Sequence, residues 1–209
     1  MTGVNATTAD RSYRGKRVVD LVILAIVAIP AIVVGATCAA AIRLFAPGPV
    51  FFRQERVGLR GDRFQVWKFR TMTPGDNPIF PDASRITGVG KILRRSSLDE
   101  LPQLINVALG EMSIVGPRPT LGYQVDRYDD VQRERLAVRP GLTGLAQVSG
   151  RNALAWGERI RFDLDYVERN SLRLDLQILA RTARTMLSGH GVEGHPTDDP
   201  LAAQEESSA

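Results

Sequence analysis

The segment LVILAIVAIPAIVVGATCAAAI, residues 21–42, decides the architecture of this chain because its 22 residues carry no charge. As a single helix it would be about 33 Å long, enough to cross a hydrocarbon core of about 30 Å. Pro30 lies near its middle, where a proline removes a backbone donor and kinks or breaks a helix. The segment is therefore either a single-pass anchor or a pair of short helices that enter and leave the membrane on the same side.

Both flanks of this segment are basic, with Arg11, Arg14, Lys16 and Arg17 before it and Arg43, Arg53 and Arg56 after it. Because basic flanks tend to stay on the cytoplasmic side, the pattern favours a re-entrant helix–break–helix over residues 16–45, with the break at Pro30. A cleaved signal peptide is the other alternative, since the small residues Ala39–Ala41 follow a basic start. The apolar run is longer than a usual signal core, which argues against cleavage.

The rest of the chain has the length of one domain. From 209 residues we expect a single catalytic domain over residues 46–195, with disordered ends at residues 1–15 and 196–209. The formal charge is +4, and without the acidic tail residues 1–195 carry 27 basic and 19 acidic residues, a formal charge of +8. Such a body favours anionic partners, namely lipid, nucleotide or nucleic acid. The single Cys38 excludes an internal disulfide and a cysteine-rich zinc site.

Local patterns predict a helix-rich α+β domain. Residues 50–57 and 64–72 are rich in aromatic and β-branched residues and predict a small β-hairpin. Residues 74–84 predict a loop, and residues 101–109 a helix that ends at Gly110. Apolar residues spaced by three and four predict an amphipathic helix over residues 172–187. That helix either lies on the membrane surface or packs against the core.

The run RRSSLDELPQL, residues 94–104, places two adjacent carboxylates, Asp99 and Glu100, at the expected start of a helix. A capping box between Ser97 and Glu100 explains them without any function. The helix start also attracts anions, and a carboxylate in a cationic setting stays ionised. Adjacent helical residues point about 100° apart, so we expect two different roles for Asp99 and Glu100.

Arginines recur beside prolines and glycines after this run. Arg118 stands between Pro117 and Pro119, where two prolines restrain the backbone around one guanidinium. The stretches 139–144 and 150–152 repeat the pattern more weakly, around Arg139 and Arg151. Together with Asp99 they indicate an oligophosphate site. The acidic triplet 163–165 and the histidine-containing stretch 190–195 are weaker candidates for binding a metal, and no phosphate-loop or dinucleotide-binding glycine pattern is present.

Read together, these motifs resemble the bacterial sugar transferase family, the small monotopic phosphoglycosyl transferases. The resemblance runs from about Lys16 to His195 and rests on the motifs KFRTM (68–72), SLDEL (97–101), GEMS (110–113), VGPRP (115–119), RPG (139–141) and GRN (150–152). It implies transfer of a sugar phosphate from a UDP-sugar to a polyprenyl phosphate, with Mg²⁺ and release of UMP. It also implies a position in the inner leaflet of the bacterial cell membrane, in contact with membrane lipid, with the catalytic domain cytoplasmic.

The resemblance also assigns roles to residues. It makes Asp99 the nucleophile and a Mg²⁺ ligand, makes Glu100 its partner, and gives phosphate binding to Arg94, Arg118 and Arg151. The physics agrees, because phosphoryl transfer depends on positioning and on neutralising charge, and a carboxylate nucleophile gives a reactive mixed anhydride. The family's membrane helix breaks at a Ser-Pro pair, and here that pair is Ile29-Pro30.

Two alternatives stay open. A membrane-tethered binding protein for anionic lipid or nucleic acid would explain the charge and the anchor, but not the arginines around a carboxylate pair, so we expect no nucleic-acid partner. A glycosyltransferase that passes on only the sugar would release UDP instead of UMP. The sequence contains no pattern that identifies the sugar, the polyprenol length or the oligomeric state.

Overall fold

The computed structural model describes residues 9–73, 83–150 and 154–188. In chain order its elements are α1 Lys16–Phe45, β1 Phe51–Val57, η1 Leu59–Gly61, β2 Arg63–Phe69, η2 Ala83–Arg85, α2 Gly88–Arg95, η3 Leu98–Gln103, α3 Leu104–Leu109, β3 Ser113–Val115, α4 Gly122–Asp126, α5 Asp130–Arg133, η4 Glu134–Ala137, β4 Gly141–Thr143, α6 Leu145–Ser149, α7 Trp156–Arg169 and α8 Leu172–Ser188. The η segments are 3₁₀ helices. The predicted helix-rich α+β class is confirmed.

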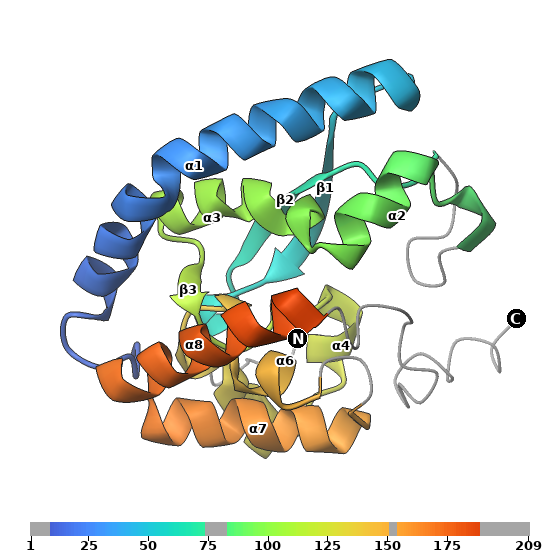
Figure 1. Cartoon of the computed structure of the whole chain (residues 1–209). Helices are drawn as coiled ribbons and strands as arrows, with labels where there is room; N and C mark the ends of the chain where they lie inside the picture. The colour runs from blue at the N-terminus through green and yellow to red at the C-terminus, as the bar shows by residue number, and fades with distance from the viewer. Residues whose placement is uncertain (1–8, 74–82, 151–153, 189–209) are drawn as a thin grey trace, which may run out of the picture.

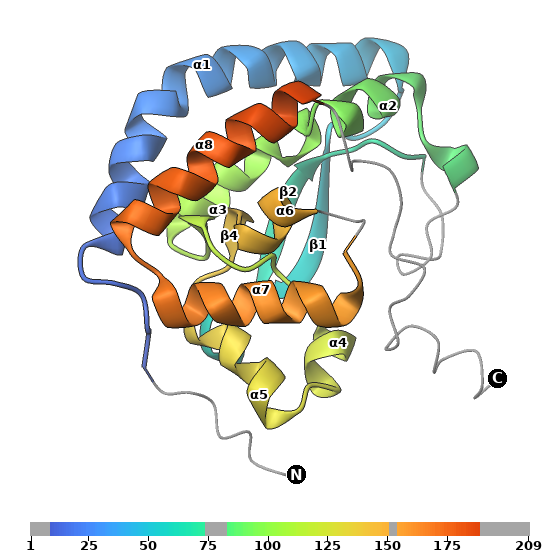
Figure 2. The ribbon, with the colours of Figure 1, turned by 60° about the horizontal axis from the view of Figure 1, so that its bottom comes forward.

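Helix α1 arches over the rest of the molecule (Figure 1) and bends along its length (Figure 2). It is one helix of 30 residues that continues through Pro30, so the predicted break is a bend rather than an interruption. The physical reason is that a proline removes one hydrogen bond of the ladder, and the turns on either side keep theirs. On its outer side Ile26, Ile29 and Ile32 are 70–76% exposed. By length and composition α1 is able to cross a membrane.

Both ends of α1 are fastened to the same folded body. Near the C-terminal end, Cys38 and Ile42 are buried against Phe69 of β2 and Leu93 of α2. The turn that follows is held by Arg70, which donates hydrogen bonds to the backbone carbonyls of residues 46, 47 and 49. The helix therefore returns to the body that its first turns contact.

The first turns of α1 are held by a buried ionic cluster, the anchor cluster, which comprises Tyr13, Lys16, Asp20, Ser113, Tyr166 and Asp175. Lys16 Nζ lies 3.1 Å from Asp20 Oδ1 and 2.8 Å from Asp175 Oδ2. The hydroxyls of Tyr13 and Tyr166 donate to Asp175 at 2.9 and 2.8 Å, and the Ser113 hydroxyl and Ile114 N–H donate to Asp20. This cluster joins α1, β3, α7 and α8.

The N-terminal segment predicted to be disordered is partly described. Residues 1–8 lie outside the described residues, as does the tail from 189 onward. Asp10, however, pairs with Arg139 at 2.6 Å, Arg11 pairs with Glu134 at 2.9 Å, and the Tyr13 N–H donates to Asn170. Residues 10–13 are thus bound to the domain, in contrast to the prediction, because their polar groups find partners on it.

The predicted hairpin is confirmed as the antiparallel pair β1–β2. Phe51 pairs with Phe69 and Phe52 with Lys68, so the two neighbouring phenylalanines point to opposite faces. Phe51 lies with Trp67 and Phe69 on the other face, here called the outer face, where the end of α1 covers Phe69. Phe64 and Val66 are buried in the main core from the inner face, and Lys68 shares that face.

A second, parallel sheet of β3 and β4 was not predicted, because its strands are three residues long and show no period. Gly116, directly after β3, and Gly141, the first residue of β4, permit the close approach of the two backbones: a Cβ on Gly141 would lie 2.0 Å from the Gly116 nitrogen. The repeated Gly-Pro-Arg and Arg-Pro-Gly patterns are therefore, in part, a packing requirement.

Helices α7 and α8 close the side of the body away from the hairpin (Figure 1). Tyr166 of α7 and Ile178 of α8 are fully buried in the main core. The helix predicted over 172–187 is confirmed, and Leu172 and Leu176 leave it with an exposed apolar side. Whether α8 lies on a membrane surface stays a prediction.

Candidate active site

Asp99 and Glu100 lie in η3, a 3₁₀ segment rather than the predicted α-helix start. Ser97 precedes it in the left-handed region at φ 57° and makes no capping hydrogen bond through its side chain, so the alternative explanation by a capping box does not hold. The backbone turns sharply at Ser97, and Pro102, which lies within η3, cannot donate a backbone hydrogen bond. Both features favour the short 3₁₀ segment. Glu100 is thereby released from a capping role and points to other partners.

Glu100 is held by two cations. Its Oε1 accepts hydrogen bonds from Lys68 Nζ at 2.7 Å and from an Arg118 amino group at 2.8 Å. Burial alone would raise the pKa of Glu100, but Arg118 and Lys68 together hold it well below its ordinary value. Burial lowers the pKa of Lys68, against the attraction of Glu100. Lys68, Asp99, Glu100 and Arg118 form what we call the site cluster.

Asp99 is in a different state from its neighbour. In the described part of the chain no hydrogen bond or ion pair reaches its carboxylate. Burial raises the pKa of Asp99 above its ordinary value; Lys68 opposes that rise and Glu100 adds to it. Lys68, Arg118 and Arg94 favour ionised Asp99, as expected, but burial outweighs them, and the direct hydrogen bonds of Lys68 and Arg118 go to Glu100. The Asp99 carboxylate therefore keeps its lone pairs open.

Arg118 is held in place by its backbone, with its side chain directed to the site. Its loop follows β3, and Arg56 and Arg135 donate to the Pro119 and Arg118 carbonyls at 3.3 and 3.5 Å. Burial and the charge of Arg118 lower the pKa of Arg56 to about 10. The Arg118 side chain is half exposed. Its guanidinium therefore meets Glu100 on one side and solvent on another.

The other predicted arginines differ in their position relative to the site cluster. The Arg94 side chain donates to the Thr71 hydroxyl at 2.9 Å and to the Met72 sulfur, and its charge favours ionised Asp99. Arg94 thus lies beside the site cluster without contacting either carboxylate. Arg151, like the stretch 190–195, lies outside the described residues. Arg139 serves the fold, because it binds the Gly110 carbonyl and Asp10.

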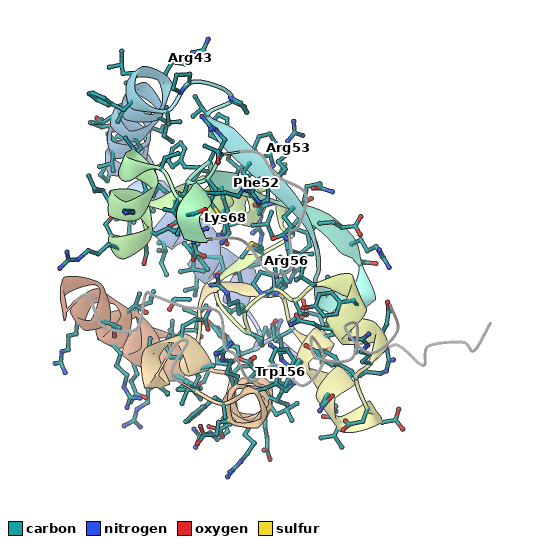
Figure 3. The ribbon with its side chains drawn as sticks, turned by 90° about the vertical axis from the view of Figure 1, so that its right-hand side faces the viewer. Arg43, Phe52, Arg53, Arg56, Lys68 and Trp156 are labelled. Atoms are coloured by element: carbon teal, nitrogen blue, oxygen red, sulfur yellow. The ribbon has the colours of Figure 1, made fainter. Side chains whose placement is uncertain are left out.

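Sequence reasoning missed Lys68 and Arg56 as site residues. Both lie on the inner face of the hairpin, where they alternate with the outward-facing Arg53. In Figure 3 the labelled cross-strand partners Phe52 and Lys68 lie above Arg56, and Trp156, which begins α7, lies below it. Two sequence features could have identified these residues: the alternation of side chains along the hairpin and the KFRTM motif around Lys68.

The acidic triplet 163–165 does not form a metal site. Asp163 pairs with Arg135 in the interior, and Asp165 pairs with Arg169 at the surface. Among the described residues no three acidic, His or Cys side chains gather as a metal cage. Mg²⁺ needs no such cage, because it is commonly held by one or two carboxylates together with substrate phosphates and water. The open Asp99 carboxylate fits that role, whereas Glu100 is occupied.

Comparisons with known proteins identify a family and several relatives. Residues 11–189 match the family described as bacterial sugar transferase. The chain is 45% identical over 157 residues to the uncharacterized sugar transferase EpsL of Bacillus subtilis, an alignment that covers 74% of this chain and 78% of that protein. It is 44% identical over 186 residues to a UDP-glucose:undecaprenyl-phosphate glucose-1-phosphate transferase of Caulobacter vibrioides. That alignment covers 83% of this chain and 70% of the Caulobacter protein. An exopolysaccharide production protein, ExoY of Sinorhizobium fredii, is 42% identical over 69% of this chain and 73% of its own length.

Proposed function

Because the chain belongs to the bacterial sugar transferase family, we propose that it transfers a sugar 1-phosphate from a UDP-sugar to a polyprenyl phosphate such as undecaprenyl phosphate, releases UMP, and so initiates the synthesis of an exopolysaccharide or a similar glycoconjugate. The observation that carries this proposal is the partly buried Asp99 carboxylate without a partner, next to a Glu100 that Lys68 and Arg118 already neutralise.

In the first half-reaction an Asp99 oxygen attacks the phosphorus that carries the sugar. The new bond joins that phosphorus to the carboxylate, and the bond to the bridging oxygen breaks, so the electron pair leaves with UMP. Arg118 and Arg94 carry the charge that the phosphoryl oxygens need in the transition state. Arg118 has amino groups free of Glu100 for this, and Arg151 is proposed as a third phosphate ligand.

In the second half-reaction an oxygen of the lipid phosphate attacks the same phosphorus. The phosphorus–carboxylate bond breaks and Asp99 regains its electron pair, so no oxidant or further co-reactant is needed. Glu100 holds Lys68 and Arg118 beside the incoming phosphate and keeps their charges from repelling each other. We place Mg²⁺ on Asp99, where, when bound, it neutralises diphosphate charge and supports departure of UMP.

The nucleotide product tests this proposal directly. Incubation of the purified chain with Mg²⁺, undecaprenyl phosphate and each of several UDP-sugars should release UMP with one sugar or a few. Release of UDP would indicate transfer of the sugar alone. Release of neither, together with binding of anionic vesicles, would favour the membrane-tethered binding protein.

We also propose that α1 is re-entrant and lies in the inner leaflet, with the catalytic domain cytoplasmic. The support is that both ends of α1 contact the same folded body: the start forms an ion pair with Asp175, and the end packs against Phe69 and Leu93. A spanning helix would place these ends on opposite sides of a hydrocarbon layer about 30 Å thick. The exposed isoleucines of α1 and the exposed leucines of α8 would then face lipid.

Cysteine labelling tests the topology. In a Cys38→Ala background, Arg14→Cys and Asp62→Cys stand before and after α1, both at exposed positions. A membrane-impermeant thiol reagent should reach neither in intact cells and both after lysis. Labelling of Arg14→Cys alone in intact cells would establish a spanning helix.

A further inference from the structure

An exposed aromatic side chain beside the site cluster is left without a role by the chemistry above. Phe52 is the direct cross-strand partner of Lys68, and direct partners on one face have Cβ atoms about 5 Å apart. Lys68 in turn holds Glu100. Phe52 therefore stands next to the place where phosphate is expected, and Figure 3 shows it beside Lys68 on the hairpin.

Aromatic packing does not account for this phenylalanine. It is 44% exposed, and among the described residues no aromatic ring contacts it. Its neighbour Phe51 is exposed to the same degree, 45%, but stacks on Phe69 and meets Trp67 edge-on. Phe51 thus has aromatic partners in the fold, whereas Phe52 has none among the described residues and leaves nearly half of its surface exposed beside Lys68.

The inner face of β1 changes character along its length. Phe52, Gln54 and Arg56 follow one another on this face, and Arg56 donates to the Gln54 side chain at 2.7 Å. The cationic end lies near Arg118. The aromatic end lies at the start of β1, which follows α1 after residues 46–50, and the last residues of α1, Leu44 and Phe45, are each 74% exposed. Apolar side chains are therefore exposed both at the end of the proposed membrane-facing helix and at Phe52 beside the site.

This graded face matches an amphiphile that has a phosphate at one end and a hydrocarbon chain at the other. In a polyprenyl phosphate the first isoprene unit is joined to the phosphate through one oxygen, so it lies within one side chain of that phosphate. In the UDP-sugar the groups at the corresponding distance are polar. Contact between hydrocarbon and the Phe52 ring is favourable, whereas the same ring in water is not.

We infer that Phe52 contacts the first isoprene units of the lipid acceptor and guides its phosphate to Asp99, which makes it a specificity-determining residue of the second half-reaction. The inference rests on the proposed function. The competing occupants are the uracil base and the sugar of the UDP-sugar, which would stack on or contact the Phe52 ring. Both belong to the first half-reaction. The two half-reactions can be measured separately, so they distinguish these occupants.

The experiment compares Phe52→Ala with the matched control Phe51→Ala. Without acceptor, UMP release and the gain of one sugar phosphate in protein mass report the first half-reaction. Discharge of that adduct by undecaprenyl phosphate, in phosphatidylethanolamine–phosphatidylglycerol vesicles, reports the second. For Phe52→Ala we expect adduct formation within about twofold of the unaltered chain and discharge slower by about tenfold, the order expected when a phenylalanine side chain loses contact with hydrocarbon. Phe51→Ala should leave the ratio of the two rates unchanged.

Two further variants keep the test decisive. Phe52→Leu retains an apolar contact without a planar ring, so discharge should recover most of its rate, whereas base stacking would be lost. Phe52→Gln keeps the length of the side chain and should reproduce the slow discharge if Phe52→Ala fails to fold. Slowed adduct formation, or unchanged discharge in both Phe52→Ala and Phe52→Gln, would overturn the inference alone. No UMP release from the unaltered chain would overturn the proposed function itself.

Discussion

The anchor cluster and the site cluster are both built from opposite charges drawn from distant parts of the chain, yet they end in different states. In the anchor cluster Lys16 meets Asp20 and Asp175, and both carboxylates receive further donors from tyrosine, serine and backbone groups. In the site cluster Glu100 is equally well supplied, but Asp99 is not, and the cation Arg118 is half exposed.

The difference separates a structural network from a functional one. A buried network whose members are all paired holds its elements in one arrangement. A network that leaves one carboxylate without partners and one arginine half in solvent has unused capacity for a charged ligand, which carries a cost in stability. The same residue types thus fasten α1 at one place and bind substrate, as we propose, at the other.

Asp99→Asn should give the largest effect on activity. The amide is a far weaker nucleophile, so turnover should fall by at least about 10³-fold and no sugar phosphate adduct should form. Mass spectrometry of the intact protein with a UDP-sugar and Mg²⁺ measures the adduct. Glu100→Gln is the matched control one residue away, and it should still form the adduct. An adduct that persists in Asp99→Asn would remove Asp99 as the nucleophile.

Asp175→Asn should give the largest effect on stability. The amide leaves Lys16 buried with one carboxylate instead of two, at a cost of about 3 kcal/mol. Urea unfolding in detergent measures this, and the surviving folded protein should keep its rate of adduct formation. Asp165→Asn is the control, because its pair with Arg169 is largely exposed and is worth less than about 1 kcal/mol. Equal losses in the two variants would contradict the anchoring role.

Arg118→Lys should have an intermediate effect confined to the site. Lysine can replace the single bond to Glu100, but it cannot present the planar fork that we propose for phosphate. We expect adduct formation slower by about 10²-fold, the order found when one charged donor to a developing oxyanion is lost, with little change in unfolding. Single-turnover UMP release measures it, and near-normal release would place Arg118 outside the phosphate site.

Much of this structure follows from the sequence where the patterns are long. The apolar run, the hairpin alternation and the spacing of residues 172–187 each extend over many residues, so α1, β1–β2 and α8 were predictable. The pair β3–β4 was not, because three residues carry no period and the pairing joins segments far apart in the chain. The sequence also left open whether Pro30 bends or interrupts α1, because a proline removes one hydrogen bond in either case.

The proximity of some candidate residues was predictable, but their electrostatics were not. Glu100 and Arg118, which the motifs single out, are in contact, while Lys68 was visible only as part of a motif. That these residues form the active site stays a prediction. Which carboxylate the cations would neutralise depends on burial and on the left-handed turn at Ser97, and neither can be read from neighbouring residue types. Two different roles for adjacent carboxylates were expected, and their environments are indeed opposite.

The smallest expected effect concerns stability: substitutions of Glu100 and of Asp99 should change the free energy of unfolding in opposite directions. The folded-state pKa of Glu100 is depressed, so its stabilisation is present above the unfolded value of about 4.3 and is lost as pH falls through the folded value. The folded-state pKa of Asp99 is raised, so its ionised form destabilises the fold above that value, and the cost disappears below about 3.9. At pH 7, Glu100→Gln should therefore lower the free energy of unfolding by about 1 kcal/mol, because its partner Arg118 is half exposed. Asp99→Asn should raise the free energy of unfolding. Both differences from the unaltered chain should shrink between pH 5 and pH 3 in urea titrations. Changes of the same sign at pH 7 would show that the two carboxylates share one environment, and the division of roles between them would fail.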